Sequence, residues 1–113
     1  MVEVIITGKL SVEKGRRGEQ ELASLLRRSG YTVERGGTQS YGEKPDLYGL
    51  RGIHIECKRR ERLDLSKAMQ QAEADAHRFN DGFPTVFSRR SGEPWRVTMN
   101  LCDWLTLYDQ ADL

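Results

Sequence analysis

The sequence predicts an α/β domain in which helices cover both faces of a central mixed β-sheet. Two segments place apolar residues at helical spacing, and five short segments alternate apolar and polar residues or lie between turn signals. Short turns join the early strands into a meander, whereas a helix separates the third strand from the fourth and can carry a crossover. The 113 residues suffice for one hydrophobic core but not for two. We therefore expect a single domain over residues 1–113.

The first half of the chain is expected to form one helix and three strands. Apolar residues at helical spacing predict a helix over about residues 14–29, and Gly30 is well placed to end it. Alternation and turn signals predict strands over residues 31–35, 46–50 and 53–58. The glycine-rich residues 36–42 predict a mobile loop. Residues 1–10 fit an edge strand, a dimer arm or a disordered segment, and the sequence does not choose among these.

The second half is expected to form a helix, two strands and a short terminal helix. Asp64 or Ser66 can cap a helix that ends near Phe79. Strands are expected over residues 84–88 and 95–99, followed by a helix over residues 101–108. The large apolar residues of this C-terminal part are expected in the core, with a dimer surface as the alternative: Trp95, Val97, Met99, Trp104, Leu105 and Tyr108.

The composition excludes a disordered chain and a membrane protein. Hydrophobic residues make up 37% and charged residues 31%, and no apolar run approaches the roughly 18 residues of a spanning helix. We expect a cytoplasmic protein with no membrane partner, because the N-terminus lacks the basic start of a signal peptide. The net charge is +1, but residues 1–62 carry 13 basic and 9 acidic side chains, so one side of the molecule could meet a polyanion. Cys57 and Cys102 have no metal or disulfide spacing and are expected to be buried thiols.

Acidic side chains on two neighbouring strands predict a metal site. Glu56 and Lys58 share one face of their strand with α-carbons roughly 6.6 Å apart, close enough to act on one phosphate, although an exposed salt bridge explains them as well. Asp46 follows Pro45 at the start of the preceding strand and can face Glu56. Two such carboxylates repel unless a cation lies between them, and Mg²⁺, with Mn²⁺ as a substitute, fits oxygen ligands. A Pro-Asp turn is the alternative interpretation of Asp46.

A third acid enters the apolar stripe of the first predicted helix. Glu19 shares a helix face with Leu22 and Leu26, and a buried carboxylate needs a partner or a metal, so we expect Glu19 to point toward Asp46 and Glu56. A solvated first-turn glutamate is the alternative. Gly15 and Gly18 flank this face and would let the helix approach the sheet or a phosphate closely.

With these residues assembled, the chain resembles the PD-(D/E)XK nuclease superfamily, and within it the Holliday junction resolvase branch. A closer likeness is to small resolvase-like proteins encoded by phages and prophages of Gram-positive bacteria. The resemblance runs over about residues 14–108 and implies a restriction-endonuclease-like core. The residues that carry it are Lys14-Gly15, Glu19, Arg35, Pro45-Asp46, Glu56-Cys57-Lys58, the basic cluster that ends at Arg62, and Gln71-Ala72.

The resemblance implies a magnesium-dependent DNA endonuclease that leaves 5′-phosphate and 3′-hydroxyl ends. Asp46 and Glu56 would hold one or two Mg²⁺ ions, with the backbone carbonyl of Cys57 as an extra ligand and Glu19 assisting directly or through water. Lys58 would orient the attacking water and stabilise negative charge, and Gln71 would support the site. Phosphate contacts are expected from Lys14, Arg16, Arg17, Arg35, Lys44, Arg59, Arg60 and Arg62.

Symmetric cutting of a four-way junction implies a homodimer, and no organic cofactor is expected. The same motifs fit a nuclease for flaps or ends and an RNA-processing nuclease. A catalytically silent DNA-binding module with the nuclease fold is a further alternative, against which the presence of Asp46, Glu56 and Lys58 counts. His54 shares the face of Glu56, but a buried histidine with a satisfied hydrogen bond is the simpler interpretation.

Overall fold

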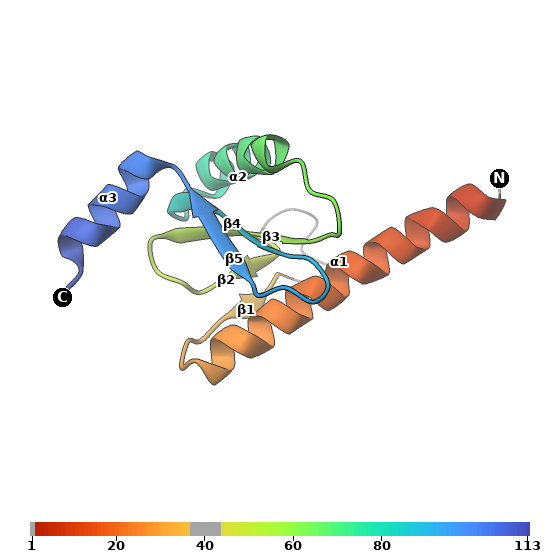
Figure 1. Ribbon diagram of the computed structural model, residues 1–113, viewed down its shortest axis with the longest axis horizontal. Helices are drawn as coiled ribbons and strands as arrows, with labels where there is room; N and C mark the ends of the chain where they lie inside the picture. Colours follow the sequence, from red (N-terminus) through yellow and green to blue (C-terminus); the bar gives the residue numbers. More distant parts are fainter. Residues whose placement is uncertain (1, 37–43) are drawn as a thin grey trace.

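The computed structural model describes residues 2–36 and 44–113, with side chains described from residue 15 onward. The described chain forms a five-stranded sheet and three helices (Figure 1). In chain order the elements are α1 (Val2–Arg28), β1 (Glu34–Arg35), β2 (Leu47–Tyr48), β3 (Ile53–Arg59), α2 (Leu65–Phe79), β4 (Phe83–Arg89), β5 (Arg96–Met99) and α3 (Leu101–Gln110). The predicted α/β class and the predicted order of elements are therefore confirmed.

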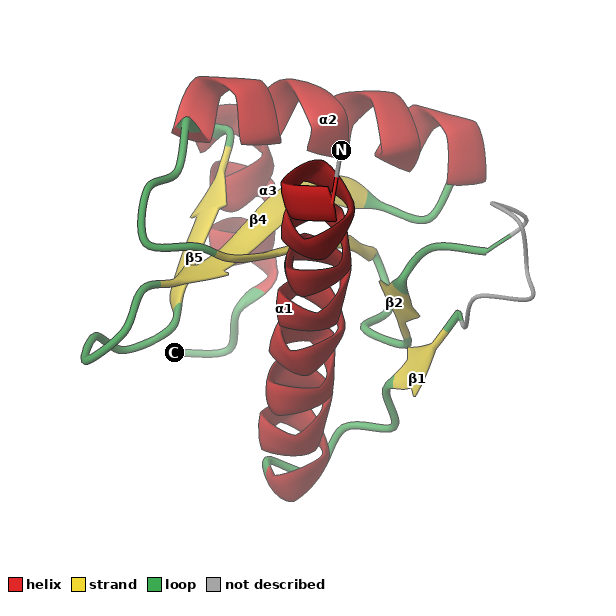
Figure 2. Cartoon of the chain, turned by 90° about the vertical axis from the view of Figure 1, so that its right-hand side faces the viewer, coloured by secondary structure: helices red, strands yellow, loops and turns green. Residues whose placement is uncertain are grey.

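The sheet is mixed, with the strand order β1-β2-β3-β4-β5. Strands β1, β2 and β3 pair antiparallel as the predicted meander, and β4 and β5 also pair antiparallel. The crossover through α2 makes β3 and β4 parallel, with Ile53 beside Phe83 and Arg59 beside Arg89. Figure 2 shows β1 at one edge of the sheet and β5 at the other.

Helices α1 and α2 cover opposite faces of the sheet (Figure 1). On the α1 face, Leu22 and Ala23 pack against Ile55 and Phe87 in the larger hydrophobic cluster. On the α2 face, buried alanines of the helix pack against Val86. The alternation of side chains along β3 and β4 separates these two clusters. Asp64 caps α2 through a hydrogen bond from the backbone N–H of Lys67, so the first of the two predicted caps is correct.

The N-terminal segment is helical, and residues 2–10 form no edge strand. Helix α1 begins at Val2, and its N-terminal end extends away from the sheet (Figure 1). The β-branched residues Val2, Val4, Ile5 and Ile6 have low helix propensity, but extending an existing helix adds one hydrogen bond for each residue fixed. The predicted glycine loop lies largely outside the described residues, because residues 37–43 are not described.

The C-terminal apolar residues are more exposed than a core requires. Helix α3 has no buried residue, and Val97 and Trp104 are 60% and 47% exposed. The core prediction is wrong for Val97, Trp104, Leu105 and Tyr108, whereas Trp95 packs against the larger cluster and Met99 is partly buried. The reason is that α3 follows the edge strand β5, where no further layer of the described chain covers it.

Cys102 on α3 is also exposed, so the prediction of a buried thiol is wrong there, while Cys57 is partly buried. A search of the described residues finds no helix with both the length and the apolar character of a membrane span.

Helix α1 approaches β3 closely at Gly18. A methyl group added at Gly18 would lie 2.5 Å from Cβ of Arg59, whereas one added at Gly15 would meet nothing within 4 Å among the described residues. The prediction that a small residue lets the helix approach the sheet is thus confirmed for Gly18. The close approach at Gly18 therefore fixes the distance between the sheet and the next residue of the helix, Glu19.

Replacing Gly18 with alanine is expected to lower the free energy of unfolding by about 1–3 kcal/mol, the usual cost of overpacking. Gly15→Ala is the matched control in the same helix, and it is expected to keep or raise stability by up to about 1 kcal/mol through helix propensity. Urea denaturation followed by circular dichroism compares the two. Equal unfolding midpoints would contradict the packing argument.

Candidate functional site

Three predicted acids from different elements line one cavity. Leu47 pairs with Ile55, and the antiparallel register continued by one residue places Asp46 beside Glu56. Glu19 of α1 lines the same cavity as these two acids. These acids, together with Lys58, line a cavity of about 570 Å³. Its full lining is Gly15, Glu19, Asp46, Glu56, Cys57, Lys58, Arg59, Arg60, Glu61 and Arg62.

The cavity lies where the pairing of β2 with β3 ends. Strand β2 is two residues long and contributes one paired position, Leu47, to β3. In the described part of the chain, no strand lies on that side of β3 beyond Ile55. Glu56 and Lys58 line the cavity at this place, together with Glu19 of α1.

Two basic groups accompany the acids. The Lys58 Nζ atom lies 3.5 Å from Glu56 Oε1, which agrees with the predicted shared face. The Arg35 Nη2 atom lies 3.4 Å from Glu19 Oε2. Both pairs are partly buried, with Lys58 18% and Glu56 12% exposed, so water screens them less than it screens a surface pair. The ammonium of Lys58 is held beside the carboxylate instead of extending into solvent.

The acids disfavour one another's charge. Desolvation raises the pKa of Glu19, the carboxylate of Asp46 raises it further, and Arg35 partly opposes this. The pKa of Asp46 is raised by desolvation and then by the carboxylates of Glu56 and Asp75, with Lys58 opposing. For Glu19 and Asp46, desolvation and the neighbouring carboxylates together outweigh the opposing effect of the neighbouring cations on the pKa. A hard divalent cation with oxygen ligands is the group that such a donor set favours.

Cys57 lies among these acids as a protonated thiol. Burial, followed by the carboxylates of Glu19 and Glu56, raises the pKa of the Cys57 thiol to about 12. At neutral pH its sulfur is therefore a poor metal ligand, because metals bind the thiolate. The predicted ligand was the backbone carbonyl of this residue, and that stays a prediction.

Gln71 does not line the cavity. It is exposed on α2, and its Nε2 atom donates a hydrogen bond to Asp75 Oδ2 at 3.0 Å. Asp75 in turn acts on the pKa of Asp46. Gln71 therefore contacts Asp75, which interacts with Asp46, and Gln71 itself does not line the cavity.

The predicted phosphate contacts fall into two groups. Arg35 and Arg59 are engaged with acids, since Arg59 pairs with Glu21 at 3.7 Å and with Glu61 at 3.3 Å. The others that the structure describes are exposed and form no ion pair among the described residues: Arg16, Arg17, Lys44, Arg60 and Arg62. Among these, Arg60 and Arg62 line the cavity, and Lys44 lies over the ring of Tyr48. The side chain of Lys14 lies outside the described part.

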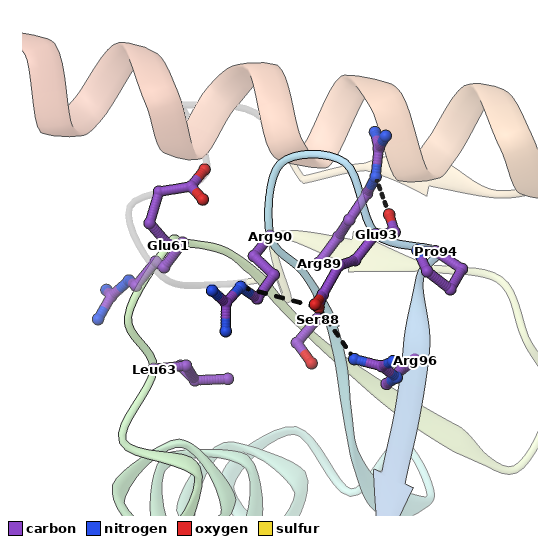
Figure 3. A pocket seen from close by; sticks show the side chains of 9 residues that line it. Glu61, Leu63, Ser88, Arg89, Arg90, Glu93, Pro94 and Arg96 are labelled. Atoms are coloured by element: carbon purple, nitrogen blue, oxygen red, sulfur yellow. Dashed lines mark hydrogen bonds and ion pairs between the residues drawn. The ribbon is translucent and has the colours of Figure 1, made fainter.

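A second basic hollow adjoins the first through Arg60, and sequence reasoning did not assign it. It has a volume of about 170 Å³, and Figure 3 shows arginines of β4, β5 and their connection along it. Arg90 and Arg96 are more than half exposed and flank Glu93, at 3.8 and 3.0 Å. The consecutive Arg89-Arg90 pair at the end of a predicted strand was the available signal.

His54, Asp75 and Asp81 were not predicted as a group. His54 is 2% exposed, and its Nδ1 atom lies 2.9 Å from both carboxylate oxygens of Asp81. The prediction of a buried, hydrogen-bonded histidine is right for Nδ1, but Nε2 has no hydrogen-bond partner among the described residues. Asp75 lies three residues after the buried Ala72, so an acid within the apolar stripe of α2 was the signal that could have found it.

A scan against protein-family models and a search of curated proteins both found no match for this chain.

Replacing Asp46 with asparagine is expected to raise the melting temperature of the metal-free protein by a few degrees. The neutral amide removes the cost of desolvating the carboxylate and its repulsion with Glu56, and these two effects raise the pKa of Asp46. Mg²⁺ is expected to stabilise the unaltered protein and to stabilise the variant much less. Thermal denaturation with chelator and with Mg²⁺ measures both effects.

The exposed Asp109→Asn on α3 is the control for loss of one negative charge, and it should change neither value. Equal stabilisation of the unaltered protein and of Asp46→Asn by Mg²⁺ would show that Asp46 holds no ion.

Proposed function

We propose that the protein is a magnesium-dependent endonuclease that hydrolyses phosphodiester bonds in branched DNA, with the four-way Holliday junction as its substrate. The observation that carries the proposal is the cavity shared by Glu19, Asp46, Glu56 and Lys58. Carboxylates from α1, from β3 and from the residue before β2 line it together, and burial and their mutual repulsion raise the pKa of Glu19 and of Asp46. The sequence resemblance to junction resolvases supplies the substrate class.

The residues of the cavity divide into ion-holding and phosphate-binding groups. Asp46 and Glu56 would hold the ion, and Glu19 of α1 would contribute a further carboxylate. When bound, Mg²⁺ would polarise the scissile phosphate and lower the pKa of a coordinated water. Their donor set fits this ion, because all three side chains offer hard oxygen ligands and Cys57 keeps its proton.

Lys58 would act on the phosphate. Its ammonium lies 3.5 Å from Glu56, so a phosphate held at the ion would lie within its reach. There it would orient the attacking water and offset the charge that develops on the phosphate oxygens. Arg60 and Arg62 line the same cavity with exposed guanidinium groups, which suit phosphates of the flanking strand. Such contacts give binding that depends on salt and not on base sequence.

Junction resolution by two symmetric cuts also leads us to propose a homodimer. The apolar side chains on β5 and α3 supply the surface for it, because five of them are exposed within one short part of the chain: Val97, Leu101, Trp104, Leu105 and Tyr108. Trp104 and Tyr108 stack on each other at 5.0 Å, which gives this surface a rigid aromatic centre.

Cleavage assays test the nuclease proposal. With Mg²⁺, the protein is expected to cut labelled four-way junctions faster than flaps, linear duplex, single-stranded DNA or RNA. Glu56→Gln and Lys58→Ala are each expected to reduce the rate by about 100-fold or more, as loss of one transition-state contact commonly does. Glu34→Gln, which changes a 59% exposed acid outside the cavity, is the matched control and should cut normally.

Junction binding without cleavage would indicate the silent module, and faster cutting of flaps, ends or RNA would replace the junction as substrate. Activity that survives in both cavity variants would refute the assignment of the site.

Replacing Trp104 with glutamate is expected to convert the dimer into a monomer, because it buries a charge in the proposed contact. Thr106→Glu, on the opposite side of the same helix, is the control and should leave the dimer intact. Light scattering during size-exclusion chromatography gives the mass of each. A monomeric unaltered protein at the concentrations that cut junctions would contradict the dimer.

A further inference from the structure

A smaller cavity lies on the α2 side of Glu56. It has a volume of about 110 Å³ and is lined by residues of β3 and α2 together with the segment before β2. His54, Glu56 and Asp75 each offer one ligand atom there, and these three atoms lie within 4.8 Å of one another. Glu56 and Asp46 border both this cavity and the larger one. Lys44 and Arg78 also line the smaller cavity.

The imidazole of His54 is oriented as metal-binding histidines are. Both oxygens of Asp81 lie 2.9 Å from Nδ1, so in the neutral ring this nitrogen carries the proton and donates a hydrogen bond to Asp81. The lone pair is then on Nε2. That atom is buried, lies 3.6 Å from Glu56 Oε2, which is too far for a hydrogen bond, and has no other hydrogen-bond partner among the described residues. A buried polar atom without a partner is costly, and a bound ion would remove that cost.

The two carboxylates are also held in place. Asp75 receives a hydrogen bond from Gln71 on the preceding turn of α2, at 3.0 Å. Glu56 lies between His54 and Lys58, at 3.6 and 3.5 Å. Zinc bonds to nitrogen and oxygen are about 2.0–2.2 Å long, which places tetrahedral ligand atoms roughly 3.3–3.5 Å apart. Small rotations of the Glu56 and Asp75 side chains therefore suffice to close the group around one ion.

We propose that His54 Nε2, Glu56 and Asp75 form a second metal site that binds a divalent transition ion such as Zn²⁺ or Mn²⁺, with Asp81 orienting the imidazole. A nitrogen ligand separates this site from the oxygen-only set proposed for Mg²⁺, because imidazole favours transition ions. Metal binding here does not require the protein to be a nuclease. If it is one, the ion adjoins the magnesium site through the shared Glu56.

The competing arrangement is a doubly protonated His54 that bridges Asp81 and Glu56. Burial lowers the pKa of His54, but the carboxylates of Glu56 and Asp81 more than offset this, so the pKa lies above its usual value. A proton thus competes with the ion for Nε2. The two arrangements differ in the state of that nitrogen when metal is present, which nuclear magnetic resonance reads directly.

The test is nitrogen-15 resonance of the two imidazoles during titration of the metal-free protein with Zn²⁺ at neutral pH, without DNA. The Nε2 signal of His54 is expected to shift to the metal-bound range while Nδ1 keeps its proton. His77 is exposed on α2 and is the internal control that should change little. Asp75→Asn is expected to weaken the zinc affinity at least tenfold, and it avoids altering the buried imidazole itself.

Glu19→Gln separates this proposal from the nuclease. Glu19 lines the larger cavity and not the smaller one, so the variant should lose DNA cleavage and keep the zinc response of His54. An Nε2 signal that stays protonated at saturating Zn²⁺, or an affinity that Asp75→Asn leaves unchanged, would overturn the second metal site. Either result would leave the cleavage assays above unaffected.

Discussion

The pairing of Leu47 with Ile55 is the constraint on which the rest of the site depends. Both side chains are buried in the cluster beneath α1, so a slip of one residue would turn Leu47 out of the core and Asp46 into it. Burial of these two apolar residues therefore holds two carboxylates side by side. The hydrophobic effect supplies the free energy that brings like charges together, and the charges themselves oppose it.

Helix α1 adds the third acid through a backbone contact. Gly18 lets the helix lie against Cβ of Arg59, and the following residue, Glu19, then reaches the cavity. Arg35 from β1 lies 3.4 Å from Glu19, so a two-residue strand at the edge of the sheet also contributes to the position of this carboxylate. The acids are thus placed by packing and by the ion pairs Glu19–Arg35 and Glu56–Lys58.

The acids of the two cavities form one electrostatic system. Asp75 raises the pKa of Asp46, and Glu56 lies beside both Lys58 and His54. A change of charge in either cavity therefore alters the electrostatic energy of the acids in the other, because only a few ångströms of partly desolvated protein separate them. Clusters of like charge that packing holds together in this way are typical of sites where stability is sacrificed for binding or chemistry.

Three features could be predicted without the structure: the order of helices and strands, the shared face of Glu56 and Lys58, and the acid in the apolar stripe of the first helix. Each of these follows from a local period of 3.6 or 2.0 residues, which any stretch of chain carries within itself. Three other features follow only from the packing of the elements. Glu19 lies close enough to Asp46 to raise its own pKa through their repulsion, His54 lies between Asp81 and Glu56, and Trp104 on α3 is exposed. These facts depend on which elements pack together and at what register, and so on the sum of many distant contacts that no short segment encodes. The helical state of residues 2–10 has a local cause instead, because extension of an existing helix outweighs the low helix propensity of the β-branched residues there.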